Sequence, residues 1–276
     1  MKPSEQRDAC VAAVQAARAA GKLIRQNQNA VKKISLICQH DIKLEMDVRC
    51  QKLIERMLRA RFPRISILGE EGSVGQPQAD LRWVVDPIDG TVNFTYGIPH
   101  VCVSIALQER LAPNHPKLKG CVGRILGEEY QTLIGVVFDP FSDELWTAVR
   151  DRPPRLNGQV IRTSKRRRLK ETVVSVGFSK TAENLRLMLP YFNQLVHRVR
   201  KIRIMGSAAL GLAYIACGRF DAYIEGGVRL WDVAAGALLV ECAGGEFWHR
   251  PIPGESYAYR MVASNGLLRA KLQPPL

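Results

Sequence analysis

Short apolar runs bounded by glycine, proline or aspartate recur along this chain, and their order constrains the fold more than any other feature of the sequence. Five runs in the middle of the chain predict strands, at residues 65–68, 81–85, 101–107, 133–138 and 145–149. After Ser164 such runs alternate with helical periodicity, which predicts strands at 173–178, 201–204, 222–224 and 260–263 and helices at 183–198, 208–217 and 233–242. Strands that alternate with helices indicate an α/β architecture.

The N-terminal part has a helical pattern instead. Apolar or small residues at helical spacing predict a first helix over residues 4–28, with Ser4 as its N-cap, and a second from about Asp47 to Arg61. We therefore expect an α/β protein in two parts, an α+β N-terminal half (residues 1–164) and an α/β C-terminal half (residues 165–276). A chain of 276 residues is long enough for one large domain or two fused halves.

Composition excludes several classes of protein. The N-terminus contains no uninterrupted apolar segment of the kind found in signal peptides, and no stretch approaches the roughly 18 apolar residues of a membrane span. The seven cysteines are scattered and include no Cys-x-x-Cys pair, which argues against a disulfide framework and against a zinc site. We expect a cytoplasmic protein with no membrane partner.

Positive charge is the strongest bias in the composition. Lys and Arg number 40 against 26 Asp and Glu, a formal charge of +14, and such an excess first suggests a nucleic-acid or acidic partner. The densest basic run, SKRRRLK at residues 164–170, contains no aromatic residue on which a base would stack. We interpret it as a solvated connector and keep nucleic-acid binding as an alternative. The long segment 111–131 is either structural decoration or a specificity or oligomer contact.

The sequence WVVDPIDGTVNF (residues 83–94) places two carboxylates, Asp86 and Asp89, at the end of an apolar strand. Carboxylates this close repel each other unless a cation lies between them, and hard oxygen donors, including the Ile88 carbonyl, suit Mg²⁺. Gly90 permits close backbone approach, and a helix that begins near Thr91 would direct N–H groups at an anion. The motif predicts phosphoryl chemistry, although taken alone it also fits an Asp-Pro turn followed by an N-cap.

Three further acids follow the same pattern. Glu70 follows the first apolar run, and Asp232 and Asp47 each lie at the start of a predicted helix, where the alternative for both is an N-cap. Acids at strand and helix ends are what a two- or three-metal site needs. The sequence contains no Walker A loop, dinucleotide-binding glycine motif, Gly-x-Ser-x-Gly elbow or histidines at metal-ligand spacing. Water activated by a metal is therefore the expected nucleophile.

At this combination of residues the chain resembles the inositol monophosphatase family of magnesium-dependent, lithium-sensitive phosphatases. The most specific match is the pair of motifs Asp86-Pro87-Ile88-Asp89-Gly90-Thr91 and Trp231-Asp232-Val233-Ala234-Ala235-Gly236. Other matching segments run through nearly the whole chain in the family's order: 41–47, 69–71, 135–139, 156–158, 206–208 and Glu225. The resemblance implies a layered α-β-α-β-α sandwich of the type shared with fructose-1,6-bisphosphatase, Mg²⁺ as cofactor and a homodimer.

By position, the resemblance also implies roles for individual residues. The metal ligands would be Glu70, Asp86, the Ile88 carbonyl, Asp89 and Asp232, with Asp47 near a third, weaker metal. The catalytic residues would be Glu70, Thr91 and Asp47, of which Glu70 and Thr91 orient and deprotonate the attacking water. The substrate contacts would be Ile88, Asp89, Gly90, Thr91, Gly206, Ser207, Ala208, Glu225 and Asp232. Among these, Gly90 and Thr91 would hold the phosphate, and Glu225 would accept hydrogen bonds from hydroxyls of the alcohol.

The reaction that the resemblance implies is hydrolysis of a small polyol or sugar phosphate, with inositol 1-phosphate as the first candidate. The alternatives are fructose 1,6-bisphosphate, histidinol phosphate, nucleotide 3′-phosphates and, in another class, an RNA- or protein-binding regulatory role of the basic surface. The chain departs from the family's pattern by carrying Lys43 and Glu45 but no Thr between Asp41 and Asp47, and by having Arg229 where many members have His. Arg229 would contact either a second anionic group on the substrate or a neighbouring acid.

Overall fold

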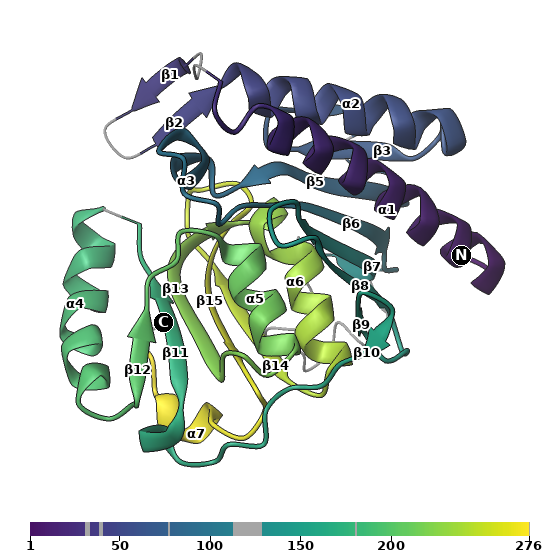
Figure 1. Cartoon of the computed structure of the whole chain (residues 1–276). Coiled ribbons are helices and arrows are strands. Elements are labelled where there is room, and N and C mark those ends of the chain that lie inside the picture. Colours follow the sequence, from purple (N-terminus) through teal and green to yellow (C-terminus); the bar gives the residue numbers. More distant parts are fainter. Residues whose placement is uncertain (31–33, 39–40, 77, 113–128, 180, 276) are drawn as a thin grey trace.

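The computed structural model describes residues 1–30, 34–38, 41–76, 78–112, 129–179 and 181–275, with backbone elements alone at 34–38 and 41–43. Helices and strands stack in alternating layers (Figure 1). Helices α1 (Pro3–Gln26) and α2 (Glu45–Arg61) cover one face of an eight-stranded sheet. Helices α5 (Ala208–Ala216) and α6 (Leu230–Cys242) separate this sheet from a five-stranded one, whose far face packs against α4 (Ala182–Val196). This order confirms the layered α-β-α-β-α fold.

The eight-stranded sheet has the order β10-β9-β8-β7-β6-β5-β3-β4. Its strands are β3 (Ser66–Gly69), β4 (Gly72–Val74), β5 (Leu81–Asp89), β6 (Cys102–Arg110), β7 (Tyr130–Asp139), β8 (Glu144–Val149), β9 (Arg155–Leu156) and β10 (Gln159–Val160). Only β3 and β5 pair in parallel, so both strands end at the same edge of the sheet. A short helix, α3 (Thr91–Thr95), begins two residues after β5.

The five-stranded sheet has the order β12-β11-β13-β15-β14. Its strands are β11 (Val173–Gly177), β12 (Lys201–Arg203), β13 (Ala222–Arg229), β14 (Glu246–Pro251) and β15 (Ala258–Ser264). Strand β11 is parallel to both neighbours, and the other pairs are antiparallel. The remaining elements are the hairpin of β1 (Ile34–Cys38) and β2 (Asp41–Leu44), a 3₁₀ turn at Leu169–Glu171 and the C-terminal helix α7 (Arg269–Leu272).

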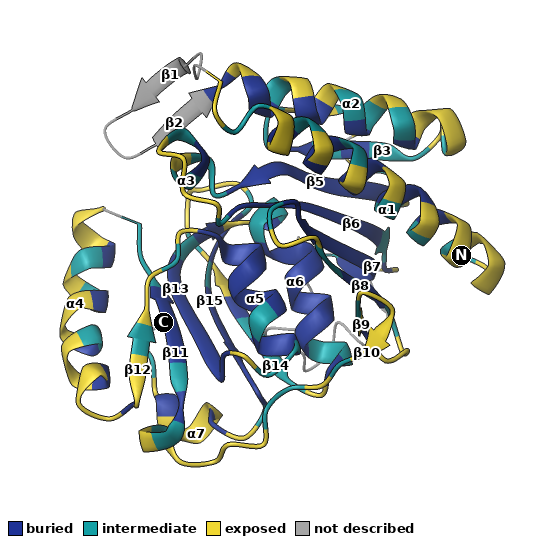
Figure 2. Cartoon of the chain, viewed as in Figure 1, coloured by how far each residue is buried: buried dark blue, intermediate teal, exposed yellow. Residues whose placement is uncertain are grey.

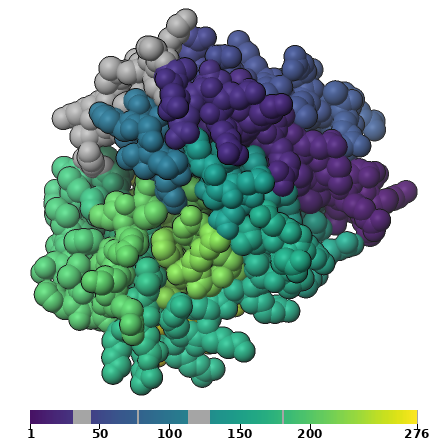
Figure 3. Space-filling model, viewed as in Figure 1, coloured from purple at the N-terminus to yellow at the C-terminus, as the bar shows by residue number. Residues whose placement is uncertain are grey.

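The two middle helices are apolar on every side because both of their faces pack on a sheet. Figure 2 shows α5 and α6 almost wholly buried, whereas α1, α2 and α4 are exposed on their outer faces. Small residues permit the close packing of the layers. A Cβ at Gly135 of β7 would lie 2.6 Å from the Ala235 carbonyl oxygen of α6, and one at Gly236 would lie 2.6 Å from the Leu212 Cβ of α5. In space-filling form the N-terminal helices lie along the top and the C-terminal layers below (Figure 3).

Most predicted elements are confirmed, within a few residues at their ends. The prediction of Ser4 as an N-cap is wrong: the cap is Lys2, and Pro3 is the first helical residue, where its missing N–H costs nothing. The sequence reading also missed β1, β2, β4, β9, β10, β14 and α7. These elements are short or lie at sheet edges, and the apolar runs in their sequences are at most three residues long. The two-part division at residue 164 stays a prediction.

The basic connector is attached to the C-terminal sheet. The Arg166 guanidinium forms an ion pair of 2.8 Å with Asp221, whose other carboxylate oxygen accepts a hydrogen bond from the Val173 N–H. Asn265 donates hydrogen bonds to Ser164 and to the Arg166 carbonyl. These contacts support the interpretation of residues 164–170 as a structural connector.

Three further predictions concern the segment 111–131, the cysteines and the absence of a membrane span. Of the segment 111–131, residues 113–128 lie outside the described part of the chain. The five cysteines whose side chains are described are all free thiols. No helix within the described ranges combines the length and the apolar composition that crossing a membrane requires.

Candidate active site

The predicted acidic residues come from distant parts of the chain and lie together where several elements begin or end. Glu70 directly follows β3. Asp86 and Asp89 lie within the last four residues of the neighbouring strand β5. Asp47 and Asp232 lie in the first turns of α2 and α6. Because β3 and β5 are parallel neighbours, with Gly69 opposite Val85, the residues that follow them share one edge of the sheet.

The pKa shifts of Glu70 and Asp86 show that the acids lie close to one another. Burial raises the pKa of Asp86 well above its ordinary value, and the charges of Glu70, Asp89, Asp232 and Asp47 raise it further. The pKa of Glu70 is raised by burial and by Asp232 and Asp47, although a hydrogen bond with Asp86 lowers it. Such mutual repulsion of buried carboxylates costs folding free energy, and it calls for a cation or for protons.

The turn after β5 has a defined geometry. The pairing of β5 with β6 is shifted between Asp86 and Asp89, which marks a bulge. The Ile88 N–H donates a 2.9 Å hydrogen bond to Asp86 Oδ1, and the Thr91 hydroxyl donates a 3.0 Å hydrogen bond to the Ile88 carbonyl. Gly90 has φ +100°, and a Cβ there would lie only 3.0 Å from the His100 carbonyl oxygen. A residue without a side chain is therefore required at this position.

Asp89 connects the end of β5 to the start of α5. Its carboxylate accepts hydrogen bonds from the Ser207 hydroxyl at 2.6 Å and from the backbone N–H groups of Ala208 at 3.1 Å and Ala209 at 2.6 Å. Burial raises the pKa of Asp89, and these hydrogen bonds oppose the rise. Because α5 follows the predicted substrate-contacting residue Gly206, this link fixes 206–208 beside the carboxylates.

Asp47 and Asp232 occupy the third position of their helices, not the N-cap. The Leu44 N–H donates a 2.8 Å hydrogen bond to Asp47 Oδ2, and the Arg229 N–H donates a 2.7 Å hydrogen bond to Asp232 Oδ2. The predicted helix starts at Asp47 and Val233 were therefore two and three residues late, since the helices begin at Glu45 and Leu230. In both helices a side chain in the first turn satisfies an N–H just before the helix.

Glu225 lies on β13, and its side chain is buried. The Tyr223 hydroxyl donates a 2.7 Å hydrogen bond to Glu225 Oε2. Burial and the charge of Asp232 raise the pKa of Glu225 to about 8. A Cβ at Gly177 of the neighbouring strand would lie 1.6 Å from Glu225 Oε2, so the carboxyl occupies the space that this glycine leaves.

Several supporting side chains were not singled out from the sequence. Asn93 donates 2.9 Å hydrogen bonds to the carbonyls of His100 and Met205 and so ties the motif to the loop before α5. Gln51 accepts a 2.8 Å hydrogen bond from the Glu71 N–H. Asn93 could have been found from the sequence, because it lies inside the motif WVVDPIDGTVNF. Gln51 had only a weak signal, as a polar residue on the face of α2 that is buried.

Arg229 contacts a neighbouring acid. Its guanidinium forms a 3.0 Å ion pair with Glu255 and donates a 3.2 Å hydrogen bond to the Ser256 carbonyl. The sequence left two partners open for Arg229, an anionic group of the substrate or a neighbouring acid. In the structure its partner is the neighbouring acid, Glu255.

The donor chemistry at this site fits a hard divalent cation. The candidate ligands are carboxylate and carbonyl oxygens, and the carboxylates are buried close enough to raise one another's pKa. Across the described side chains, no three His, Cys, Asp or Glu residues form a group already arranged around a metal position. Asp89 and Asp232 are instead turned toward protein N–H and O–H groups.

Comparison with known proteins identifies the family. The sequence model of the inositol monophosphatase family matches residues 5–118 and 120–270. The chain belongs to the inositol monophosphatase family. It is a phosphatase of that type, and the family is generally metal-dependent.

Named relatives fall into two groups. The chain is 39% identical over 84% of its length to "Nus factor SuhB" of Xylella fastidiosa, covering 78% of that protein. It is 37% identical over 84% of its length to "Inositol monophosphatase 1" of Solanum lycopersicum, covering 81% of that protein. Among solved structures, the extragenic suppressor protein suhB of Bartonella henselae matches with a TM-score of 0.81 and 32% identity, with 95% of both chains covered. An inositol monophosphatase of Thermotoga maritima matches with a TM-score of 0.77 and 29% identity, covering 94% of this chain and 92% of that one.

Proposed function

We propose that this phosphatase is a Mg²⁺-dependent phosphomonoesterase that acts on a small polyol phosphate, with inositol 1-phosphate as its first substrate. The observation that carries the proposal is the convergence of Glu70, Asp86 and Asp232, whose buried carboxylates repel one another. A cation between them removes this repulsion and at the same time attracts an anionic phosphate. Family membership supports the same reaction class.

Mg²⁺ would be held by Glu70, Asp86, the Ile88 carbonyl, Asp89 and Asp232, with Asp47 near a weaker site. When bound, Mg²⁺ would stabilise the negative charge of the phosphate and lower the pKa of a water molecule that it binds. The protein's own part is positioning. The Thr91 hydroxyl donates a hydrogen bond to the Ile88 carbonyl, so the lone pairs of Thr91 Oγ1 are left to accept a hydrogen bond from a water nucleophile and so orient it.

The substrate's two halves would be bound by different segments. The N–H groups of Gly90 and Thr91 would hold the phosphate. Ser207 and Glu225 would face the alcohol, where a carboxyl accepts hydrogen bonds from hydroxyls. Arg229 is engaged by Glu255 and Ser256, which favours a substrate with a single phosphate over fructose 1,6-bisphosphate.

The direct test is phosphate release by the purified full chain. We expect activity with Mg²⁺, none in EDTA, and a loss of several orders of magnitude in Asp86→Asn. Asp143→Asn is the matched control, because Asp143 is an exposed aspartate whose φ of 53° asparagine adopts readily. Full activity in EDTA, or an active Asp86→Asn variant, would contradict the metal-dependent reaction.

A substrate panel tests the finer proposal. Inositol 1-phosphate, fructose 1,6-bisphosphate, histidinol phosphate and nucleotide 3′-phosphates are compared by kcat/KM under one set of conditions. We expect the highest value for inositol 1-phosphate and inhibition of that reaction by Li⁺. A higher kcat/KM for another ester would replace inositol 1-phosphate as the proposed substrate but keep the reaction class.

We also expect the protein to be a homodimer, and light scattering measures this.

A second candidate function is a regulatory role in binding RNA or protein. It is favoured by the name "Nus factor SuhB" carried by several relatives and by the exposed cations of residues 165–170. Since Arg166 is paired with buried Asp221 and Arg168 with Glu171, the test should neutralise the exposed residues Lys165, Arg167 and Lys170 instead. Salt-sensitive RNA binding that weakens in this triple variant supports the role. Unchanged binding removes the reason for it.

A further inference from the structure

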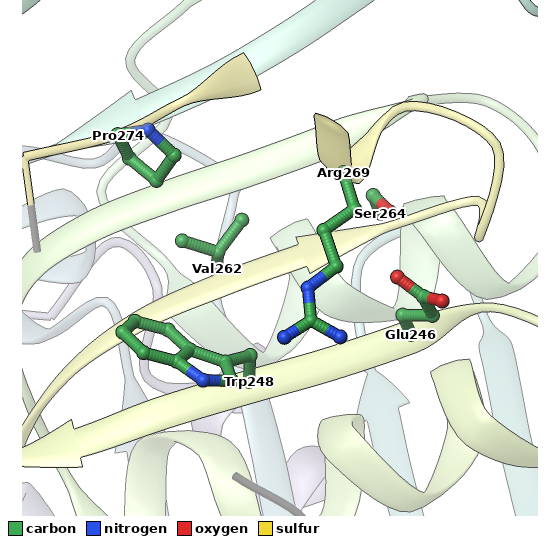
Figure 4. Close-up of a pocket in the computed structure, with 6 residues that line it drawn as sticks. All are labelled: Glu246, Trp248, Val262, Ser264, Arg269 and Pro274. Carbon is green, nitrogen blue, oxygen red and sulfur yellow. The ribbon is translucent and has the colours of Figure 1, made fainter. Parts of the chain in front are cut away.

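A cavity of about 270 Å³ lies on the outer face of the five-stranded sheet, away from the acidic site. It is lined by Glu246 and Trp248 of β14, Val262 and Ser264 of β15, Arg269 of α7 and Pro274 (Figure 4). Trp248 packs with the hydrophobic cluster that includes Ile224 and Val262, whereas Tyr223, on the same strand face as Glu225, packs against α5 and α6. The cavity and Glu225 therefore lie on opposite faces of the sheet.

The cavity has an apolar half and a polar half. In Figure 4 Trp248, Val262 and Pro274 lie on one side, and Arg269, Ser264 and Glu246 lie on the other. The Arg250 guanidinium lies over the Trp248 ring, 5.3 Å from its centroid, so at most one face of the indole is left to stack on a planar group. The C-terminal wall is held in place, because Leu272 is buried and its carbonyl accepts a 2.8 Å hydrogen bond from the Tyr191 hydroxyl.

At the polar end of the cavity, one carboxylate oxygen lacks a hydrogen-bond partner among the described residues. Glu246 Oε2 is buried, and within the described residues it has no hydrogen-bond partner. Arg269 lines the same cavity, yet no ion pair between the described residues joins it to Glu246. A buried acceptor without a donor costs free energy, and such a group calls for an explanation.

The missing partner must satisfy both charges. It must donate N–H groups to the Glu246 carboxylate and accept a hydrogen bond from the Arg269 guanidinium, and its body must be flat and apolar enough to stack on Trp248. A lactam edge of a heteroaromatic ring has these properties, because its N–H lies next to its C=O. Guanine presents two N–H donors beside O6, and arginine donates to guanine O6 and N7 in a common geometry. The cavity volume suits a base-sized fragment better than a drug-sized ligand.

We propose that this cavity is a binding site for the lactam edge of a purine base, formed by Glu246, Arg269 and the indole of Trp248. Glu246 accepts from the ring N–H and the exocyclic amine, and Arg269 donates to the ring oxygen. The site is independent of the phosphatase reaction on the other face of the sheet.

Equilibrium dialysis of the full chain with guanosine tests this proposal, because guanosine carries no phosphate ester and is not hydrolysed. We expect saturable binding of one guanosine per chain, somewhat weaker binding of inosine, which lacks the exocyclic amine, and at least tenfold weaker binding of adenosine and 1-methylinosine. Adenosine lacks the lactam, and 1-methylinosine lacks its N–H. Saturating inorganic phosphate should leave the affinity for guanosine unchanged.

Variants connect the binding to the cavity. Glu246→Gln and Arg269→Ala should each weaken guanosine binding by about tenfold or more, because each removes a charge-assisted hydrogen bond. Arg186→Ala is the matched control, since Arg186 is an exposed arginine of α4 that does not line the cavity. Arg269 is exposed, so its truncation keeps the test valid if Glu246→Gln fails to fold.

Four outcomes would overturn the proposal. One is the absence of saturable binding at millimolar guanosine. Another is binding that phosphate displaces, which would place the nucleoside in the phosphatase site. The third is guanosine binding that Glu246→Gln and Arg269→Ala leave unchanged. The fourth is adenosine binding as strong as guanosine binding.

Discussion

Replacing Glu225 by glutamine should change how the stability of this protein depends on pH. Glu225 is enclosed between Tyr223 and Gly177, and burial together with Asp232 raises its pKa from 4.5 to about 8. Glutamine has nearly the same shape and can still accept the hydrogen bond from the Tyr223 hydroxyl, but it does not titrate. The substitution therefore removes the ionisation and leaves the packing in place.

The sign and size follow from the two pKa values. Between pH 4.5 and 8 the unfolded chain has released the Glu225 proton and the folded protein keeps it, so the free energy of unfolding falls as pH rises through this window. Each pH unit within the window costs about 1.4 kcal/mol. Between pH 5 and pH 8 Glu225 should cost the wild type about 3 kcal/mol of stability that Glu225→Gln does not lose.

The assay is urea denaturation of both proteins at pH 5, 6, 7 and 8 in EDTA, since a bound cation would favour the ionised carboxylates. The other acids contribute almost equally to both proteins, so the difference between the two curves reports Glu225. Tyr223→Phe provides a second measurement, because losing a hydrogen bond that lowers the pKa of Glu225 should extend the slope above pH 8. Parallel pH profiles of wild type and Glu225→Gln would refute the reasoning.

Further substitutions and conditions probe the rest of the site. Mg²⁺ should raise the Tm of the wild type measured in EDTA-treated protein but not that of Asp86→Asn, because a ligand that binds only the folded state stabilises it; an equal rise in both would contradict the assignment of Asp86. Ser207→Ala should cost about 1–3 kcal/mol in urea denaturation and weaken Mg²⁺ binding, since it removes a 2.6 Å hydrogen bond to buried Asp89. Gly177→Ala should destabilise the fold by about 1–3 kcal/mol, because its Cβ would overlap Glu225 Oε2; wild-type stability would mean that Glu225 moves freely. With a formal charge of +14, kcat/KM for a phosphate ester should fall as NaCl rises while kcat changes little, and a salt-independent kcat/KM would exclude steering.

The sequence predicted the fold best where burial is continuous. Strands β5, β6 and β7 are buried along nearly their whole length, so their sequences are mostly apolar, with few polar interruptions such as Arg82 and Ser104. The predicted strand 81–85 was too short because Asp86 and Asp89 are polar, although both are buried in β5. A prediction based on apolar runs ends the strand at the first aspartate. In the structure β5 continues through Asp86 to Asp89 and so reaches the site.

Edge elements and long-range partners could not be predicted in this way. Strand β14 alternates between half-buried and buried residues before two exposed ones, and its sequence EFWHRP has only two consecutive apolar residues. Arg229 is the last residue of β13, whereas its ion-pair partner Glu255 lies in the connection between β14 and β15. Such a contact depends on how the β14–β15 connection lies against α6, which local sequence does not determine.

The sequence also left the acids with two interpretations, as caps and as metal ligands, and the hydrogen bonds suggest that the two are compatible. A carboxylate has two oxygens, so one can accept from the backbone while the other faces a ligand. Asp86 Oδ1 accepts from the Ile88 N–H, and Asp232 Oδ2 accepts from the Arg229 N–H. A backbone donor of this kind fixes the orientation of the carboxylate before any cation binds, as hydrogen-bonding partners orient ligands in metal sites generally. The capping pattern that seemed to weaken the metal hypothesis thus becomes the means by which the chain would hold mutually repelling carboxylates in place.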